Sequence, residues 1–142
     1  CHISEPDDIS GKVLFTDFTY DNIGVPKNPA NPFYINPPDF NPLGRNALDQ
    51  GLGGFLKDSE NAGKFKVPTL RNIALSAPYF HNGFFNTLEE VVHFYNKRDI
   101  EFFPEAEIQA TVNHREMGNL KLTLQDEKDI VAFLKILSDG YK

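Results

Sequence analysis

The chain begins with a thiol next to an imidazole, Cys1 and His2. Covalent haem attachment uses the motif Cys-x-x-Cys-His, in which a thiol adds to a haem vinyl group and the adjacent histidine ligates the iron. Only the second half of that motif is present. Cys1 could equally be an ordinary terminal thiol, or the lipidated first residue of a mature lipoprotein. The dipeptide alone does not decide among these three interpretations.

A second candidate for haem chemistry lies near the other end of the chain. Haem iron takes His, Met, Cys or Tyr as ligands, and the chain contains one methionine, Met117. It stands just before the last predicted helix, a common place for a cytochrome c ligand. Met117 could instead fill a gap in the core, although its polar neighbours His114, Arg115 and Glu116 fit that role less well.

Two amphipathic helices are expected to position these groups. The first covers residues 87–97, where Thr87 and Glu90 form a capping box. Its expected buried stripe comprises Leu88, Val91, Val92 and Tyr95, at helical spacing.

The last helix is expected to begin after Thr123, with Asp126 and Glu127 in its first turn, where the helix dipole favours anions. Its predicted inner face comprises Ile130, Phe133, Leu134 and Leu137, and Ser138, Asp139 and Gly140 are expected to end it.

Much of the remaining chain is predicted to be irregular. Residues 24–54 contain six prolines, which lack an amide donor and push the preceding residue out of the helical region. A long ordered loop of this kind usually has a role such as covering a cofactor. Pro68 is expected to start a helix of one or two turns that Pro78 ends. Residues 98–116 form a second irregular segment, and no strand pattern of useful length is visible.

Size and composition limit the possibilities further. The 142 residues suit one domain, 1–142, and 13 Phe with 5 Tyr would suit the wall of a flat apolar cofactor. A net charge of −6 argues against nucleic-acid binding. An acidic surface could steer a basic partner or simply maintain solubility. No apolar run approaches the roughly 18 residues of a membrane span, no signal peptide is visible, and the single Cys excludes an internal disulfide.

Six segments together resemble the C-terminal half of the bacterial diheme cytochrome c peroxidase and MauG family. They occur in the family's order and cover nearly the whole chain. They are Cys1-His2; Leu14 to Asp17 with Asn22 to Pro26; Lys66 to Asn72; Ala77 to Gly83; Thr87 to Val92; and Leu122-Thr123 through Ile130 to Leu134. The Pro-Thr-Leu-Arg-Asn and Ala-Pro-Tyr-Phe-His-Asn-Gly stretches are quite specific.

The resemblance implies a mainly α, cytochrome c-like helical domain with long irregular loops around one covalently attached haem c. In this family a peroxide-reactive haem sits on an N-terminal domain, and the domain matched here receives electrons from a small donor protein, such as a cytochrome or cupredoxin, and passes them on. The chain would therefore be half of a periplasmic bacterial peroxidase. Either the sequence begins inside the Cys-x-x-Cys-His motif, or the haem is held by a single thioether. The resemblance leaves open whether the protein forms a homodimer.

The resemblance also implies residue roles. Cys1 is the thioether site, and His2 is the proximal ligand, whose second ring nitrogen should donate to a carbonyl or carboxylate. Met117 is the preferred distal ligand, and Tyr95 is the alternative found in MauG-like members. By the same resemblance, Arg71 contacts a haem propionate, and His81 lies near the haem without ligating it. The carbonyls of Ser76 and Pro78 contribute to a calcium ion shared with the absent domain.

Three other functions remain open. A MauG-like oxidase would modify a protein substrate, and Tyr95 as ligand would support it. A stand-alone monohaem carrier would only shuttle electrons. A helical interaction module would bind no haem at all. No catalytic residue is expected within the chain itself, and His93 and His114 have no assigned role.

Overall fold

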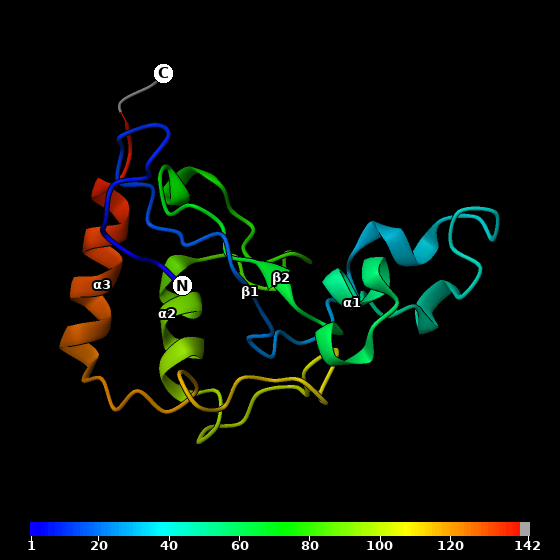
Figure 1. The fold of residues 1–142 in the computed structure, drawn as a ribbon. Coiled ribbons are helices and arrows are strands. Elements are labelled where there is room, and N and C mark those ends of the chain that lie inside the picture. The colour runs from blue at the N-terminus through cyan, green and yellow to red at the C-terminus, as the bar shows by residue number, and fades with distance from the viewer. Residues whose placement is uncertain (140–142) are drawn as a thin grey trace.

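The computed structural model describes residues 1–139 and contains three α-helices there, α1 (Gly51–Leu56), α2 (Leu88–Lys97) and α3 (Leu124–Ile136). Two short strands, β1 (Tyr20–Asp21) and β2 (Phe65–Lys66), pair antiparallel, with Tyr20 opposite Lys66. Four 3-10 turns complete the regular structure, at Pro32–Ile35, Gly44–Asn46, Ser59–Asn61 and Ile73–Leu75. Most of the described chain is therefore irregular, and the helices are packed at one end (Figure 1).

The predicted helix over 87–97 is confirmed as α2. Thr87 Oγ1 accepts a hydrogen bond from the Glu90 amide at 3.2 Å, and Glu90 Oε2 accepts one from the Thr87 amide at 2.9 Å. This capping box satisfies two donors that the helix itself leaves unpaired. Leu88 and Val92 of the predicted stripe are buried, and Phe94 is only 1% exposed.

Helix α3 begins as predicted, because Thr123 and Asp126 form a second capping box. Its inner face is partly different. Val131 and Leu134 are buried, whereas Phe133 is 44% exposed and meets the ring of Phe15 edge-on at 5.7 Å. The prediction for Phe133 was therefore wrong, because Val131 and not Phe133 lies on the face of α3 that packs into the core. The helix ends at Ile136, before the predicted stop, and Gly140 lies outside the described residues.

The predicted helix from Pro68 is absent from the described chain, which has only a 3-10 turn at Ile73–Leu75 there. The reason is pairing with a distant segment. The Val67 amide donates to the Thr19 carbonyl at 2.8 Å, and the Thr16 hydroxyl donates to the Val67 carbonyl at 2.7 Å. Asn72 then adopts a left-handed conformation, with φ of 61°. These contacts hold the segment extended.

Residues 24–54 are less irregular than predicted, because they contain two 3-10 turns and the start of α1. Helix α1 includes Gly51, Gly53 and Gly54, and glycine opposes helix formation. Gly53 is needed for packing, since a Cβ there would lie 2.5 Å from the Cα of Ala62. Close contact with the following turn therefore supports a helix that local propensity does not favour.

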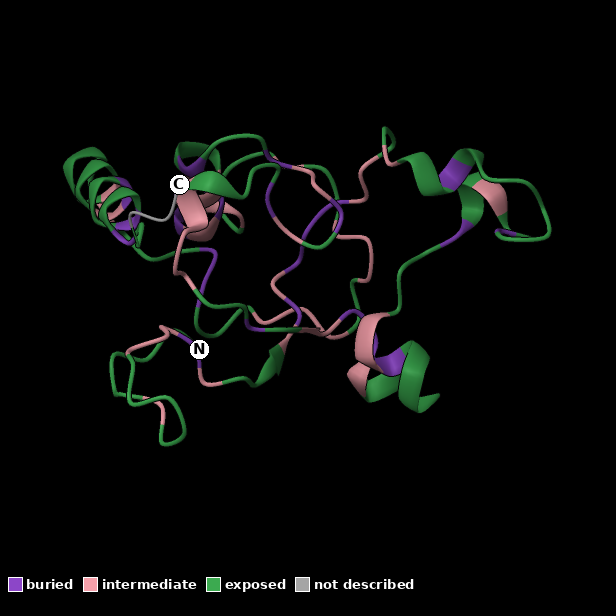
Figure 2. Ribbon diagram, turned by 90° about the horizontal axis from the view of Figure 1, so that it is seen from above, coloured by how far each residue is buried: buried purple, intermediate pink, exposed green. Residues whose placement is uncertain are grey.

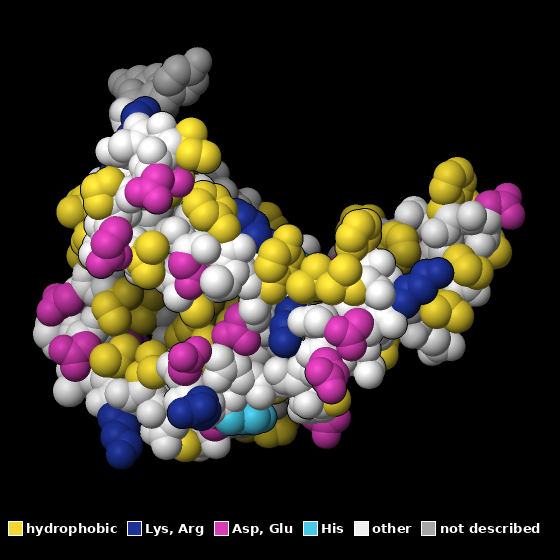
Figure 3. Space-filling view, in the orientation of Figure 1, with side chains coloured by type: hydrophobic (Ala, Val, Ile, Leu, Met, Phe, Trp, Pro, Cys, Tyr) yellow, Lys and Arg dark blue, Asp and Glu magenta, His cyan; other side chains and the backbone are white. Residues whose placement is uncertain are grey.

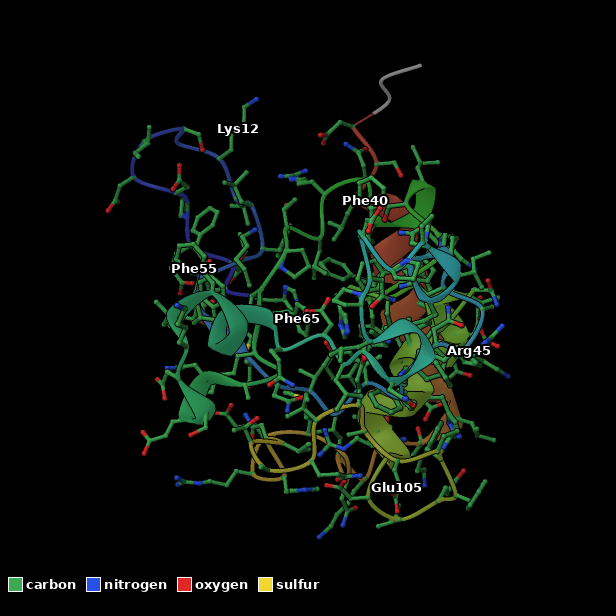
Figure 4. All side chains as sticks on the ribbon, turned by 90° about the vertical axis from the view of Figure 1, so that its right-hand side faces the viewer. Lys12, Phe40, Arg45, Phe55, Phe65 and Glu105 are labelled. Carbon is green, nitrogen blue, oxygen red and sulfur yellow. The ribbon has the colours of Figure 1, made fainter. Side chains whose placement is uncertain are left out.

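The core lies where α2 and α3 pack together (Figure 2). Its buried members are Val25, Tyr79, Phe85, Leu88, Val92, Phe94, Val131, Leu134 and Leu137. Residues 28–61 form an arm that extends away from these helices (Figure 1). Phe40 and Phe55, labelled in Figure 4, lie on this arm and are 76% and 85% exposed. Within residues 1–139, no helix has the length and apolar character that crossing a membrane requires.

Candidate functional site

A cavity of about 660 Å³ lies between the N-terminal residues and the helices α2 and α3. Its wall shares several residues with the core, including Val25, Tyr79, Leu88, Val92 and Leu134. Figure 3 shows a hollow with apolar side chains beside these two helices. Its volume lies within the range of about 300–1,000 Å³ typical of pockets for small molecules and cofactors.

Cys1 and His2 lie at the wall of this cavity. His2 Nδ1 is 2.7 Å from the Phe15 carbonyl oxygen. A carbonyl only accepts, so Nδ1 carries the proton and donates, which leaves the Nε2 lone pair available for a metal in the neutral imidazole. The predicted hydrogen bond from the second ring nitrogen is thus present. Partial burial lowers the pKa of His2, which favours this neutral form, although the Phe15 carbonyl opposes the shift.

The terminal ammonium of Cys1 pairs with the Asp17 carboxylate at 2.8 Å. Its thiol is free and exposed. The thiol sulfur and carboxylate oxygens of Asp21 and Glu116 all lie within 4.8 Å of one another. Since Glu116 precedes Met117, this contact brings the two ends of the predicted haem site together in space.

Met117 is buried, with 8% exposure, and lines the same cavity. It does not belong to the cluster of core residues around α2 and α3. The polypeptide around it is tied to the end of α2, because the Gly118 amide donates to the Tyr95 carbonyl at 2.7 Å. A buried thioether at a cavity wall is available as a ligand. A methionine that only filled a gap in the core would not need to line a cavity.

Tyr95, the alternative ligand, also lines the cavity. Burial raises the pKa of its phenol to about 12. The side chain is therefore a neutral phenol at physiological pH, unless a bound metal replaces its proton. The two predicted alternatives for the distal ligand thus face one cavity, and they differ in that Met117 needs no deprotonation.

His81 lies on another part of the wall, together with a carboxylate that the sequence analysis did not single out. The His81 ring stacks on Phe65, with centroids 3.6 Å apart. Its Nε2 is 3.5 Å from Oε2 of Glu107, whose side chain is 3% exposed. The other Glu107 oxygen accepts hydrogen bonds from the Tyr34 hydroxyl and the Asp49 amide. Burial lowers the pKa of His81.

The remaining predicted residues fall into two groups. Ser76 and Pro78 line the cavity, and the Ser76 hydroxyl donates to the Ile73 carbonyl at 2.9 Å. Arg71 is not among the residues that line it; its Nε donates to the Val13 carbonyl at 2.9 Å, and Nη1 approaches Asp139 at 3.4 Å. The calcium and propionate roles therefore stay predictions.

Among curated proteins, the chain is similar to the methylamine utilization protein MauG of Paracoccus denitrificans, with 37% identity over 155 aligned positions that cover 98% of this chain and 38% of that protein. It is 32% identical to the cytochrome-c peroxidase IdrP2 of Denitromonas iodatirespirans, over 88% of this chain and 34% of that one. No family model matches the chain. The chain thus spans less than two fifths of the length of these relatives.

Solved structures agree with the sequence relatives. The diheme peroxidase BthA from Burkholderia thailandensis superimposes with a TM-score of 0.69 and 29% identity, over 94% of this chain and 37% of that one. A MauG-like protein associated with microbial copper homeostasis gives a TM-score of 0.60 and 33% identity, over 86% of this chain and 33% of that one. By sequence and by fold, therefore, the chain belongs to the family of MauG and the diheme cytochrome c peroxidases.

Proposed function

We propose that this chain is the c-type haem domain through which electrons enter a diheme cytochrome c peroxidase. One observation carries the proposal: Cys1, His2 and Met117 line a single apolar cavity in a chain of this family. The chain would be the C-terminal haem domain of a longer periplasmic protein, with a cytochrome c-like fold. Its partners would be the N-terminal peroxidatic domain and a small donor protein, a cytochrome or cupredoxin.

The residues present fit a haem c. Cys1 offers an exposed thiol for thioether formation, His2 offers a free Nε2, and Met117 offers a buried thioether. When bound, the haem supplies a one-electron carrier, which no side chain of the chain replaces.

The chain's own residues have three tasks in this function. The Phe15 carbonyl fixes the His2 tautomer and ring orientation. The apolar wall formed by residues such as Val92 and Leu134 excludes water. Met117 and His2 would together hold the iron, and Met/His ligation would favour a high reduction potential, which would suit a domain that accepts electrons from a donor. Reduction of peroxide to water would belong to the complete protein.

A MauG-like oxidase acting on a protein substrate is the second candidate. Two observations favour it: Tyr95 lines the same cavity, and the similarity to MauG covers 98% of the chain. Burial raises the pKa of Tyr95 to about 12, so this candidate requires the bound iron to displace the phenol proton.

The test compares the haem-loaded wild type with Met117→Leu and Tyr95→Phe. A pyridine haemochrome assay should report covalent haem. The ferric wild type should show the weak near-infrared band of methionine ligation at about 700 nm; Met117→Leu should lose it and Tyr95→Phe should keep it. Absence of covalent haem would refute the proposal, and a low-spin wild type without the band, altered by Tyr95→Phe, would support the MauG-like alternative.

A further inference from the structure

Glu107 is a buried carboxylate whose two oxygens have different surroundings. Oε1 accepts hydrogen bonds from the Tyr34 hydroxyl at 3.1 Å and from the Asp49 amide at 3.0 Å, and the Glu107 amide donates to the Val25 carbonyl at 3.0 Å. Oε2 is the one buried side-chain oxygen or nitrogen of residues 1–139 that lacks a hydrogen-bond partner. Since an unpaired buried acceptor costs free energy, this oxygen is a place where a further donor would be stabilised.

His81 is the side chain that faces this oxygen. Its Nε2 lies 3.5 Å from Glu107 Oε2, and its ring stacks on Phe65, which is labelled in Figure 4, with the two ring planes 7° apart. A carboxylate next to Nε2 favours the tautomer in which that nitrogen carries the proton. The lone pair of Nδ1 is then the one that can accept a second proton, and the resulting imidazolium would have Glu107 as its counter-ion.

Opposing effects set the protonation state of His81. Burial lowers its pKa, whereas the carboxylates of Asp49 and Glu107 oppose that shift. The Tyr34 phenol beside Glu107 stays neutral, because burial raises its pKa to about 12. The nearest cation to this phenol is Lys27, whose Nζ lies 4.4 Å from the centre of the Tyr34 ring. A change in the charge of the cavity can therefore shift the balance at His81.

His81 is also the group of the cavity wall that is suited to titrate near neutral pH. The other ionisable residues of the wall, apart from Asp49 and Glu107, are Cys1, His2, Asp21, Lys66, Tyr79 and Tyr95. Histidine is the side chain that ordinarily changes charge between about pH 5 and 8. In the proposed function His2 ligates the iron, and neither His93 nor His114 lines the cavity.

We propose that His81, with Glu107 as its fixed counter-ion, binds a proton when the domain accepts an electron. The proposal rests on the proposed function only in requiring a haem in this cavity, and it holds with either distal ligand. Reduction of ferric to ferrous iron takes one electron from the donor and removes one positive charge from the cavity. A proton from water then binds to Nδ1 of His81 and restores that charge. The coupling is effective because charges interact more strongly across an apolar cavity than in water.

The experiment measures the reduction potential of the haem-loaded protein by spectroelectrochemistry between about pH 5 and 8, the range in which histidine titrates. The variants are His81→Gln and Glu107→Gln. Glu105→Gln and His114→Gln are the matched controls, since both residues are exposed and neither lines the cavity. Visible spectra and far-UV circular dichroism check that each variant is loaded with haem and folded.

The wild-type potential should fall as pH rises, because reduction with proton uptake becomes less favourable. At the steepest point the reduction equilibrium should change about tenfold per pH unit, which corresponds to about 59 mV for a one-electron couple. His81→Gln should have a potential independent of pH in this range. Glu107→Gln keeps the histidine but lacks its counter-ion, so the sloping range should move to lower pH. Both controls should follow the wild type.

A wild type that carries reducible haem but has the same potential throughout this range refutes the proposal, while the proposed function stands. The proposal is equally refuted if His81→Gln keeps the wild-type slope, or if either control loses it. Should His81→Gln not fold, Glu107→Gln decides, and an unshifted slope in that variant overturns the proposal. If the protein binds no covalent haem, the proposed function fails and this proposal fails with it.

Discussion

Asn96 is completely buried in α2, and its side chain links that helix to α3 and to the loop after Met117. Its Nδ2 donates to the Leu122 carbonyl at 3.1 Å and to Glu127 Oε1 at 2.6 Å. Its Oδ1 accepts from the Leu122 amide at 3.0 Å. Replacing Asn96 with alanine would remove all three bonds and leave three polar groups without this partner.

The size of the effect follows from these contacts. A neutral hydrogen bond contributes about 1 kcal/mol to the free energy of unfolding, and one to a charged group contributes about 1.5–3 kcal/mol. Two of the Asn96 bonds are neutral and one reaches the Glu127 carboxylate. We therefore expect Asn96→Ala to lower the free energy of unfolding by about 3–5 kcal/mol, a large part of the roughly 5–15 kcal/mol typical of domains.

Urea denaturation of the haem-loaded protein, followed by far-UV circular dichroism, measures this loss. Asn119→Ala is the control, because Asn119 is an exposed asparagine in the same loop, and its effect should stay within about 0.5 kcal/mol. Amide hydrogen exchange should also become faster at Leu122 in Asn96→Ala. A loss below about 1 kcal/mol, comparable to one neutral hydrogen bond, with unchanged exchange at Leu122, would refute the reasoning.

Three further predictions concern the helices and the cavity wall. Phe94→Ala should cost about 3–5 kcal/mol by thermal unfolding, because Phe94 is 1% exposed and packs against Phe85 and Phe103; a cost under about 1 kcal/mol would contradict that packing. Thr123→Ala should cost about 1 kcal/mol in urea denaturation through loss of the α3 cap, and Thr123→Ser should restore it. Since burial lowers the pKa of His81 in the folded state, the unfolded state binds the proton first, and stability should fall as pH drops below the ordinary value of 6.5. His81→Gln should remove part of this loss in denaturation curves at a series of pH values, and identical pH profiles for the two proteins would contradict it.

The sequence predicted best what local interactions determine. Both capping boxes lie within four residues, so the starts of α2 and α3 could be recognised from the sequence. The helix expected from Pro68 was wrong because the bond from the Val67 amide to Thr19 spans a long stretch of chain that no local pattern reveals. Phe133 was misplaced because periodicity defines a stripe but not which edge of it meets the neighbouring helix.

The candidate site shows the same division. Cys1, His2, Met117 and Tyr95 were chosen by residue type and motif, and all four line one cavity. Glu107 was missed because its partners His81, Tyr34 and Asp49 lie far from it along the sequence. Motifs thus identify groups that can react, whereas the residues that hold them are found only in the folded chain.

The core cluster around α2 and α3 is also a wall of the cavity, and residues such as Leu88, Val92 and Leu134 serve both. With the proposed haem attached, those side chains face a covalently bound group; without it, they face water. Folding and cofactor binding would then be coupled, because the apolar interior would be complete only with the cofactor in place. A newly made chain still waiting for haem would expose apolar surface, which chaperones and proteases recognise, so cellular quality control would act as a check on cofactor loading.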